Sequence, residues 1–324
     1  MITMKTPLRL GRLTASCLLV FTLLGGGNAL AEKTILLAPG GQDGLMGTMA
    51  EVIQPGLQRA LERPFEVATV IGERGGLAQD LTGRLPPDGS SLLVAELLTR
   101  AIDEALPDSD QETTLDALTP ILKLAQGISV ALVVPEGSPI GSYQELVEAA
   151  KERTLTIATS GKRSSSGVAL ALLAKRHNLP FTYSSRETVT ELFRDLDSGS
   201  TDAAIVFTRV LAFPEFKGGY RALATFGADR SQLLRRSVPT LSELSGERTD
   251  AFTTSVALFG PPAMDPEVVA RIEAAFFRGV SSDPKVLEVA VATGLDIVLK
   301  DADVVEETMA RDQNVVKRVL PLLK

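Results

Sequence analysis

The sequence predicts an α/β protein of two lobes, each built on a sheet rich in parallel strands, with a cleft between the lobes. Three observations lead to this prediction. The chain of 324 residues is long enough for two domains, each with its own core. Short β-type runs alternate with helical patterns, which favours parallel pairing through right-handed crossovers. Two continuous apolar runs, near Val133 and near Val256, can each carry the chain from one lobe to the other.

The first lobe is expected to alternate strand, helix, strand, helix, strand. Apolar residues from Leu45 to Leu61 recur at helical spacing, and Pro55 inside that pattern predicts a kink or the start of a second helix. Gly and Pro mark the turns between the elements. The expected elements are the strand Thr34–Ala38, the helix 45–61, the strand Phe65–Ile71, the helix Gly76–Arg84 and the strand Ser91–Ala95.

The second lobe is expected to continue this alternation. Ser142 with Glu145 and Thr188 with Glu191 have the spacing of capping boxes, so a helix is expected to begin at each. The expected strands are Ile128–Val134, Leu155–Ala158, Phe181–Tyr183, Asp202–Phe207 and Tyr220–Phe226, and a helix covers Ser166–His177. The chain then returns through the strand Phe252–Phe259 to helices over Pro266–Val280 and Pro284–Leu322, the latter interrupted at Leu295–Leu299. We assign residues 32–133 and 256–324 to lobe 1 and residues 134–255 to lobe 2.

The composition excludes several classes of function. With 44% apolar and 23% charged residues, the chain is too apolar for a disordered protein and too charged for a membrane channel. One Cys and one His exclude a disulfide scaffold and a thiolate metal site, and no zinc enzyme is expected. The net charge of −7 provides no field that would attract nucleic acid. We therefore expect no metal, no cofactor and no nucleic-acid partner, and we expect a monomer.

Residues 1–31 have the pattern of a signal peptide. A start with three basic residues precedes the mostly apolar run Leu13–Leu24, and Ala29–Ala31 supplies the small residues that signal peptidase requires. Cleavage is expected near Ala31 and would change the net charge from −7 to −10, because the segment contains no acidic residue. Cys17 lies inside the apolar run, whereas a lipid-anchored Cys would end it. The sequence thus predicts an exported, periplasmic protein.

Four segments have patterns that occur together in one family. Ser237–Leu244 contains V-P-T-x-x-E, Ala257–Arg271 reads as a crossing strand, a Pro-rich turn and a helix, Ala158–Gly161 is close to A-S-S-G, and Pro86–Gly89 contains P-D-G. In these features the chain resembles the Bug-type solute-binding receptors of tripartite tricarboxylate transporters, from about Thr34 to Val319. The resemblance implies a type II periplasmic-binding-protein fold that closes over a small anion. It also implies integral-membrane transporter subunits that receive the ligand.

Three positions depart from the family pattern. Glu96 stands where the family has a small hydroxyl residue, and Lys162 with Arg163 stands where it has Asn-Gly. Phe207 and Thr208 end a strand at which the family has an acidic or amide pair. Because these positions follow strands at the expected cleft, we include Glu96, Phe207 and Thr208 among the ligand-binding candidates.

The loop Pro39–Gly44 joins a strand to a helix and can bind an anion. Free N–H groups and the positive dipole at the helix start suit a carboxylate, and glycines permit a close approach. A tight turn explains the same glycines equally well from their spacing, and the resemblance favours binding. The candidates here are Gly40, Gly41, Gln42 and Asp43.

The segment 159–166 has five hydroxyl residues and two cations, also between a strand and a helix. Hydroxyl and N–H groups can hold a carboxylate, and Arg can bind it through two nitrogens. The alternative is a solvated loop with an N-capping Ser. The two cations favour a ligand with more than one negative charge, a di- or tricarboxylate. The candidates are Thr159, Ser160, Gly161, Lys162, Arg163, Ser164 and Ser165.

The function predicted is capture of a small organic anion and its delivery to a membrane transporter, without catalysis. One alternative is a solute sensor that acts with a signalling partner. A less favoured alternative is a secreted serine hydrolase that uses Ser160 or Ser164. It lacks a base, because His177 lies near the end of the next helix, about 15 Å along its axis.

Overall fold

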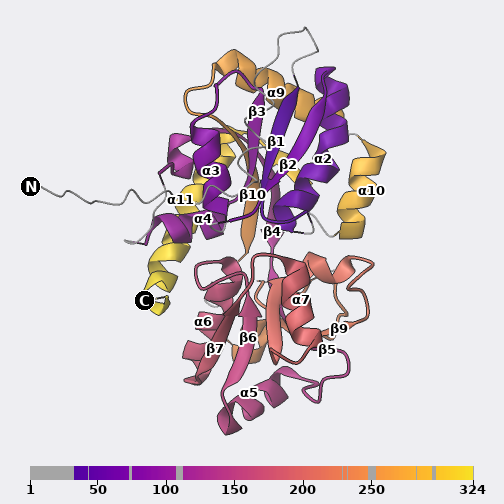
Figure 1. Ribbon diagram of the computed structural model, residues 1–324, viewed down its shortest axis with the longest axis vertical. Coiled ribbons are helices and arrows are strands. Elements are labelled where there is room, and N and C mark those ends of the chain that lie inside the picture. Colours follow the sequence, from indigo (N-terminus) through magenta and orange to yellow (C-terminus); the bar gives the residue numbers. More distant parts are fainter. Residues whose placement is uncertain are drawn as a thin grey trace, which may run out of the picture. The chain divides into compact units, whose positions relative to one another are not determined.

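The computed structural model describes residues 33–42, 44–72, 75–106, 112–227, 229–231, 233–246, 253–281, 283–293 and 297–323. The signal peptide predicted for residues 1–31 and its cleavage near Ala31 lie outside these residues. Two sheets with helices packed on them form two lobes (Figure 1), which confirms the predicted two-lobe α/β fold. We call the lobe with the six-stranded sheet the first lobe and the lobe with the five-stranded sheet the second lobe.

The first lobe has a mixed sheet, and its parallel strands are the three strands predicted for the first part of the chain. Strand β1 pairs in parallel with β2 and with β3, while β10 pairs antiparallel with β3 and β4. The spatial order is β11 (Ile297–Lys300), β4 (Thr119–Ile128), β10 (Thr254–Gly260), β3 (Ser91–Glu96), β1 (Thr34–Pro39) and β2 (Phe65–Val70). The helices are α2 (Leu45–Leu61), α3 (Gly76–Gly83), α4 (Leu97–Glu104), α9 (Pro266–Gly279), α10 (Pro284–Thr293) and α11 (Ala302–Val319).

Helix α2 continues through Pro55, so no second helix begins there. Proline removes one backbone hydrogen bond from the helix, yet Ile53 and Leu57 on either side of it are fully buried in the core. Burial of this apolar face outweighs the lost bond. Helix α2 packs against α9, where Gly56 faces Gly279.

The second lobe has the spatial strand order β7 (Phe181–Ser185), β6 (Leu155–Thr159), β8 (Ala203–Phe207), β5 (Val130–Pro135) and β9 (Tyr220–Thr225). Its helices are α5 (Tyr143–Glu152), α6 (Ser165–His177), α7 (Val189–Asp197) and α8 (Leu241–Ser245). The capping box of Thr188 and Glu191 is confirmed. At α5 half of the predicted box forms. Ser142 Oγ accepts from the N–H of Glu145, whereas the Glu145 carboxylate accepts from Gly141 N at 2.5 Å.

The chain first passes between the sheets at Ser129, which separates β4 from β5. Val133, near which the passage was predicted, lies inside β5 and pairs with Ala204. The difference arises because β4 was not predicted at all. Its apolar run is interrupted by Lys123, a charged residue that the fold buries to 3% exposure. Val256, where the return was predicted, lies in β10 and pairs with Glu96 of the first sheet.

The C-terminal helix α11 contributes to the cores of both lobes. Val305 near its start packs with Leu93 and Phe259 of the first sheet. Val316 and Val319 near its end belong to the same apolar cluster as Leu170 of α6, and the 3₁₀ helix η5 (Leu320–Leu322) that follows lies against α6. The two lobes are therefore connected by α11 as well as by the two strand passages.

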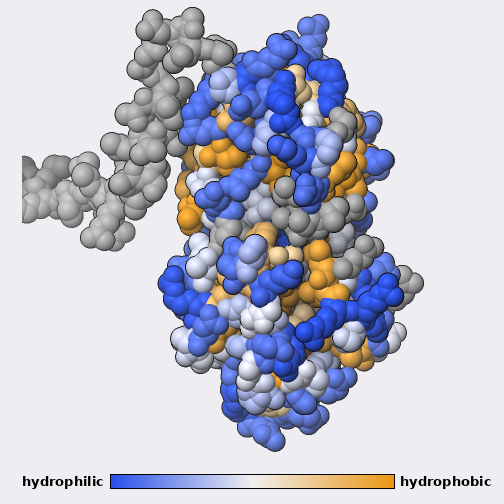
Figure 2. All heavy atoms as spheres, turned by 90° about the vertical axis from the view of Figure 1, so that its right-hand side faces the viewer, coloured by the Kyte–Doolittle hydropathy of each residue, from blue (hydrophilic) through white to orange (hydrophobic). Residues whose placement is uncertain are grey.

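Hydrophilic side chains cover most of the face shown in Figure 2, and hydrophobic ones gather in smaller patches. Within the residues described, no helix combines the length and the apolar character needed to cross a bilayer.

Candidate functional site

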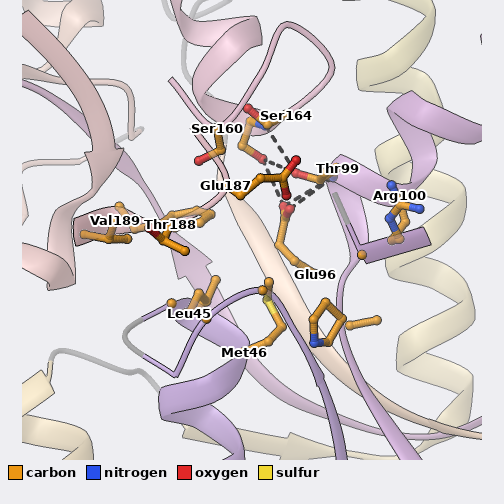
Figure 3. A pocket seen from close by; sticks show the side chains of 18 of the residues that line it. Leu45, Met46, Glu96, Thr99, Arg100, Ser160, Ser164, Glu187, Thr188 and Val189 are labelled. Carbon is orange, nitrogen blue, oxygen red and sulfur yellow. Dashed lines mark hydrogen bonds between the residues drawn. The ribbon is translucent and has the colours of Figure 1, made fainter. Parts of the chain in front are cut away.

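A cavity of about 110 Å³ is lined by residues of both lobes (Figure 3). The first lobe supplies the β1–α2 loop, the start of α2, the residues around α3 and the junction of β3 with α4. The second lobe supplies the loop before α6, the start of α7 and the end of β8. The polar and charged lining residues are Gln79, Glu96, Thr99, Arg100, Ser160, Ser164, Ser165, Ser166, Glu187 and Thr188.

The first turn of α2 reaches the cavity with Gly44, Leu45 and Met46. Gly44 is the N-cap and provides no side-chain acceptor. In the described part of the chain, the N–H groups of Leu45, Met46 and Gly47 have no hydrogen-bond acceptor. A helix start with free N–H groups and a positive dipole end attracts an anion.

The loop before α6 has the same backbone design as the loop before α2, at an offset of 120 residues. Gly44 N donates to Gly41 O at 3.0 Å, and Ser164 N donates to Gly161 O at 3.2 Å. A Cβ on Gly47 would lie 2.6 Å from Gly41 O, and a Cβ on Gly167 would likewise clash with Gly161 O. Both positions thus require glycine, because the loop folds back on the first turn of its helix.

The start of α6 differs from that of α2 because two of its first three N–H groups, those of Ser165 and Gly167, have acceptors. Ser164 Oγ accepts from Gly167 N at 3.1 Å, and Thr99 Oγ1 accepts from Ser165 N at 3.2 Å. An N-cap serine satisfies the donors that α2 leaves open. Of the two equivalent helix starts, the start of α2 therefore has more N–H groups available to a ligand among the described residues.

Glu96 is the N-cap of α4 and joins the two lobes. Its carboxylate accepts from Thr99 N at 3.3 Å, from Ser165 Oγ of the second lobe at 2.9 Å, and from Thr254 Oγ1. It is 5% exposed and has no ion-pair partner among the residues that the structure describes. The cavity wall thus holds a buried carboxylate whose donors are all neutral.

Arg100 is the one basic side chain among the described lining residues, and it is already bound to a carboxylate. Its Nη2 lies 3.1 Å from Asp103 Oδ2, and both side chains are buried. Arg163 Nη1 lies 3.7 Å from the other oxygen of Asp103. Arg100 and Arg163 therefore share the single carboxylate of Asp103 before any ligand enters.

The structure brings half of the predicted site residues to the cavity. Those that line it are Gly40, Gly41, Glu96, Ser160, Ser164, Ser165 and Phe207. Those that do not are Gln42, Thr159, Gly161, Lys162, Arg163 and Thr208. Asp43 lies outside the described residues.

The two cations that favoured a multiply charged ligand lie away from the cavity wall. Lys162 Nζ sits 5.3 Å from the centre of the Tyr183 ring, and Arg163 pairs with Asp103. Gln42, at the loop position equivalent to Lys162, also points away from the cavity and donates to Glu51. The side chains at this loop position point outward in both lobes, so the cations do not support a preference for di- or tricarboxylates.

Several lining residues were not predicted from the sequence. Gln79, Thr99 and Arg100 come from α3 and α4, and Glu187 comes from the loop before α7. The capping box at Thr188 already indicated a loop at Glu187.

Ser164, a candidate nucleophile of the hydrolase alternative, caps a helix. Its hydroxyl donates to Gly161 O at 2.7 Å and lies 2.8 Å from Ser166 Oγ. His177 Nε2 lies 2.6 Å from Tyr143 Oη, at the end of α6. Burial, together with Arg176 and Lys151, lowers the pKa of His177. The arrangement gives Ser164 a structural role.

Asp312 on α11 predicts a measurable pH dependence of stability. Burial raises its pKa to about 6, with a further rise from the charge of Glu96, while Arg311 opposes the shift. The folded state therefore holds this proton more tightly than the unfolded state, and the group stabilises the fold increasingly as the pH falls from 7.5 towards 4. We expect Asp312→Asn to raise the free energy of unfolding at pH 7.5 by about 1–3 kcal/mol, and the gain to shrink as the pH falls.

Urea unfolding at pH 7.5 and pH 5 tests this expectation. Glu307→Gln, at an exposed position of the same helix, is the matched control and should change stability little at either pH. A loss of stability in Asp312→Asn at pH 7.5 would contradict the expected cost of the buried charge.

Comparison with known proteins gives a consistent result. A family model described as the tripartite tricarboxylate transporter family receptor matches residues 49–323. The UPF0065 protein in the tcbD-tcbE intergenic region of Pseudomonas sp. (strain P51) is 26% identical over 258 residues, which are 78% of this chain and 74% of that protein.

Two solved structures share the fold. MatC from Rhodopseudomonas palustris with bound malate has a TM-score of 0.75 at 21% identity, over 89% of this chain and 100% of that chain. The periplasmic binding protein BugD has a TM-score of 0.77 at 18% identity, over 90% of this chain and 95% of that chain. These similarities agree with the two-lobe architecture described above.

Proposed function

The chain belongs to the tripartite tricarboxylate transporter receptor family, as its resemblance to the Bug-type receptors predicted, and from this premise we propose that it captures a small organic acid in the periplasm. The acid binds in the cavity between the lobes and passes to integral-membrane transporter subunits. The proposal includes export by the signal peptide of residues 1–31 and a receptor without catalytic activity.

The start of α2 is the observation on which this proposal depends. Among the described residues, the N–H groups of Leu45 and Met46, which line the cavity, have no acceptor and provide charge-assisted donors for one carboxylate. Hydrogen bonds to a charged group contribute roughly 1.5–3 kcal/mol each. A few of them, reduced by the entropy of binding, are sufficient for a micromolar Kd, which corresponds to about −8 kcal/mol.

The second lobe supports the same ligand from the opposite wall. Ser160, Ser164 and Ser165 line the cavity, and the hydroxyl group of Ser160 can donate to an organic acid, whereas those of Ser164 and Ser165 already donate to Gly161 O and Glu96. A ligand that contacts both lobes favours the form in which they are close together. Malate, a dicarboxylic acid, is bound in the R. palustris relative, which supports an organic acid as the class of ligand.

Isothermal titration calorimetry of the chain without residues 1–31 tests the proposal. The panel consists of straight-chain carboxylates of three to six carbons, with and without hydroxyl, amino and second carboxyl groups, and the carboxamide of each. We expect micromolar binding of at least one acid and at least 100-fold weaker binding of its amide. Equal affinity for acid and amide, or no binding by any member, would overturn the proposal.

A further inference from the structure

We propose that the ligand carries a protonated amine as well as a single carboxylate, and that Glu96 and Glu187 hold the amine. The inference rests on the proposed function, since it specifies which organic acid fits the same cavity. It is based on the unbalanced charge of the described lining residues and on their unused hydrogen-bond acceptors.

The described lining residues carry two carboxylates and one guanidinium. The guanidinium belongs to Arg100, which pairs with the buried carboxylate of Asp103, a carboxylate that it shares with Arg163 outside the lining. Glu96 and Glu187 have no ion-pair partner among the residues described. Counted over the described lining residues, the charge is therefore net negative, which disfavours a second carboxylate on the ligand and favours a cation.

Glu96 has the capacity to accept a further hydrogen bond. A carboxylate offers about four acceptor sites, and Glu96 has three donors, on Thr99, Ser165 and Thr254. All three are neutral, so they satisfy its hydrogen bonds without cancelling its charge. A buried charge is costly when no opposite charge lies nearby, and an ammonium group in the cavity would provide one.

Glu187 lies on the other wall and is exposed. It directly precedes Thr188, whose capping box with Glu191 fixes the backbone at this point. In Figure 3 its side chain points toward the part of the cavity where Glu96 and Thr99 lie. Glu187 makes no hydrogen bond within the described chain, so its carboxylate is available to a ligand.

Gln79 provides an independent indication of a hydrogen-bond donor on the ligand. It is fully buried and lines the cavity, and its Nε2 donates to Glu104 Oε1 and Thr113 O, both at 2.6 Å. These two acceptors fix the orientation of the amide. Its Oε1 is then an acceptor with no donor among the described residues, and such buried atoms normally have a partner.

Four compounds of one chain length separate the possibilities: pentanoate, 2-aminopentanoate, 5-aminopentanoate and glutarate. All share a carboxylate, and they differ in whether the rest of the chain carries nothing, an amine at either position, or a second carboxylate. By calorimetry we expect one of the two amino acids to bind at least 10-fold more tightly than both pentanoate and glutarate. Tighter binding of glutarate or pentanoate would overturn the inference and leave the proposed function intact.

The variant Glu187→Gln tests the assigned residue. Because Glu187 is exposed, the change should not disturb folding, and Glu152→Gln, at an exposed position of α5 outside the cavity lining, is the matched control. We expect Glu187→Gln to reduce the preference for the amino acid over pentanoate at least 10-fold and the control to keep it. An unchanged preference in Glu187→Gln would overturn the role of Glu187. Failure of all four compounds and of the wider panel would overturn the proposed function itself.

Discussion

Replacing Gly44 by aspartate is expected to weaken ligand binding at least 100-fold while the protein remains folded. Gly44 is the N-cap of α2 and has an extended backbone, with φ −74° and ψ 173°, which is the conformation in which Asp caps a helix. The new carboxylate would accept from the free N–H groups of the first turn and would repel a ligand carboxylate from them. Because the new carboxylate is part of the chain, its effective concentration at the helix start far exceeds the micromolar concentration of a free ligand, and it therefore displaces the ligand.

Gly44→Ala is the matched control for this variant. Its added Cβ, like that of aspartate, would lie 3.0 Å from Gly41 O, so both variants require the same small movement of the loop. Calorimetry should give an affinity for Gly44→Ala within a few-fold of the unchanged protein and none measurable for Gly44→Asp. Unimpaired binding by the aspartate variant would show that the start of α2 does not receive the ligand.

The second large effect is expected at the crossing of α2 and α9, where Gly56→Ala should lower the free energy of unfolding by about 3 kcal/mol. An added Cβ would lie 2.9 Å from the carbonyl carbon of Gly279 and 3.0 Å from Val280 Cγ2. The reverse contact is equally tight, since a Cβ on Gly279 would lie 2.7 Å from Ala60 Cβ. Backbone atoms cannot move aside as a side-chain end can, so the helices must separate.

Urea unfolding measures this loss. In a helix interior, Gly→Ala without a clash stabilises by up to about 1 kcal/mol, so the sign of the effect is itself informative. Gly137→Ala is the control, because a Cβ there meets no atom within 4 Å. A Gly56→Ala variant as stable as the control would mean that the two helices do not cross as closely as described.

The elements best predicted from the sequence are those separated by glycine or proline. The strands β1, β2, β6 and β8 and the helices α2, α6 and α9 were recognised because a turn residue precedes or follows each of them. Helix α4 was missed because it follows β3 without any turn residue and is capped by Glu96, the last residue of that strand. Strand β4 was missed because Lys123 interrupts its apolar pattern, although the fold buries that lysine against Thr308.

The sequence predicted the two loops of the candidate site. It did not predict the directions in which their side chains point. Glycines and serines identified the backbone around Gly41 and Ser164 correctly as cavity wall. The charges of Lys162 and Arg163 did not indicate where these side chains lie, because Lys162 rests over the Tyr183 ring and Arg163 pairs with Asp103, outside the cavity lining. Glu187 and Gln79 stand alone in the sequence, and their place in the cavity depends on packing between elements distant in the chain.

The position of α11 has a consequence for how far the lobes can part. A rotation about the two strand passages would draw η5, which follows α11, away from α6 of the second lobe and leave apolar surface such as that of Leu320 in contact with water. Re-exposing side chains of this size costs roughly 1.5–3 kcal/mol each. The segment of α11 and η5 therefore resists wide opening of the lobes even when no ligand is present. The lobes then have a shorter distance to close when a ligand binds.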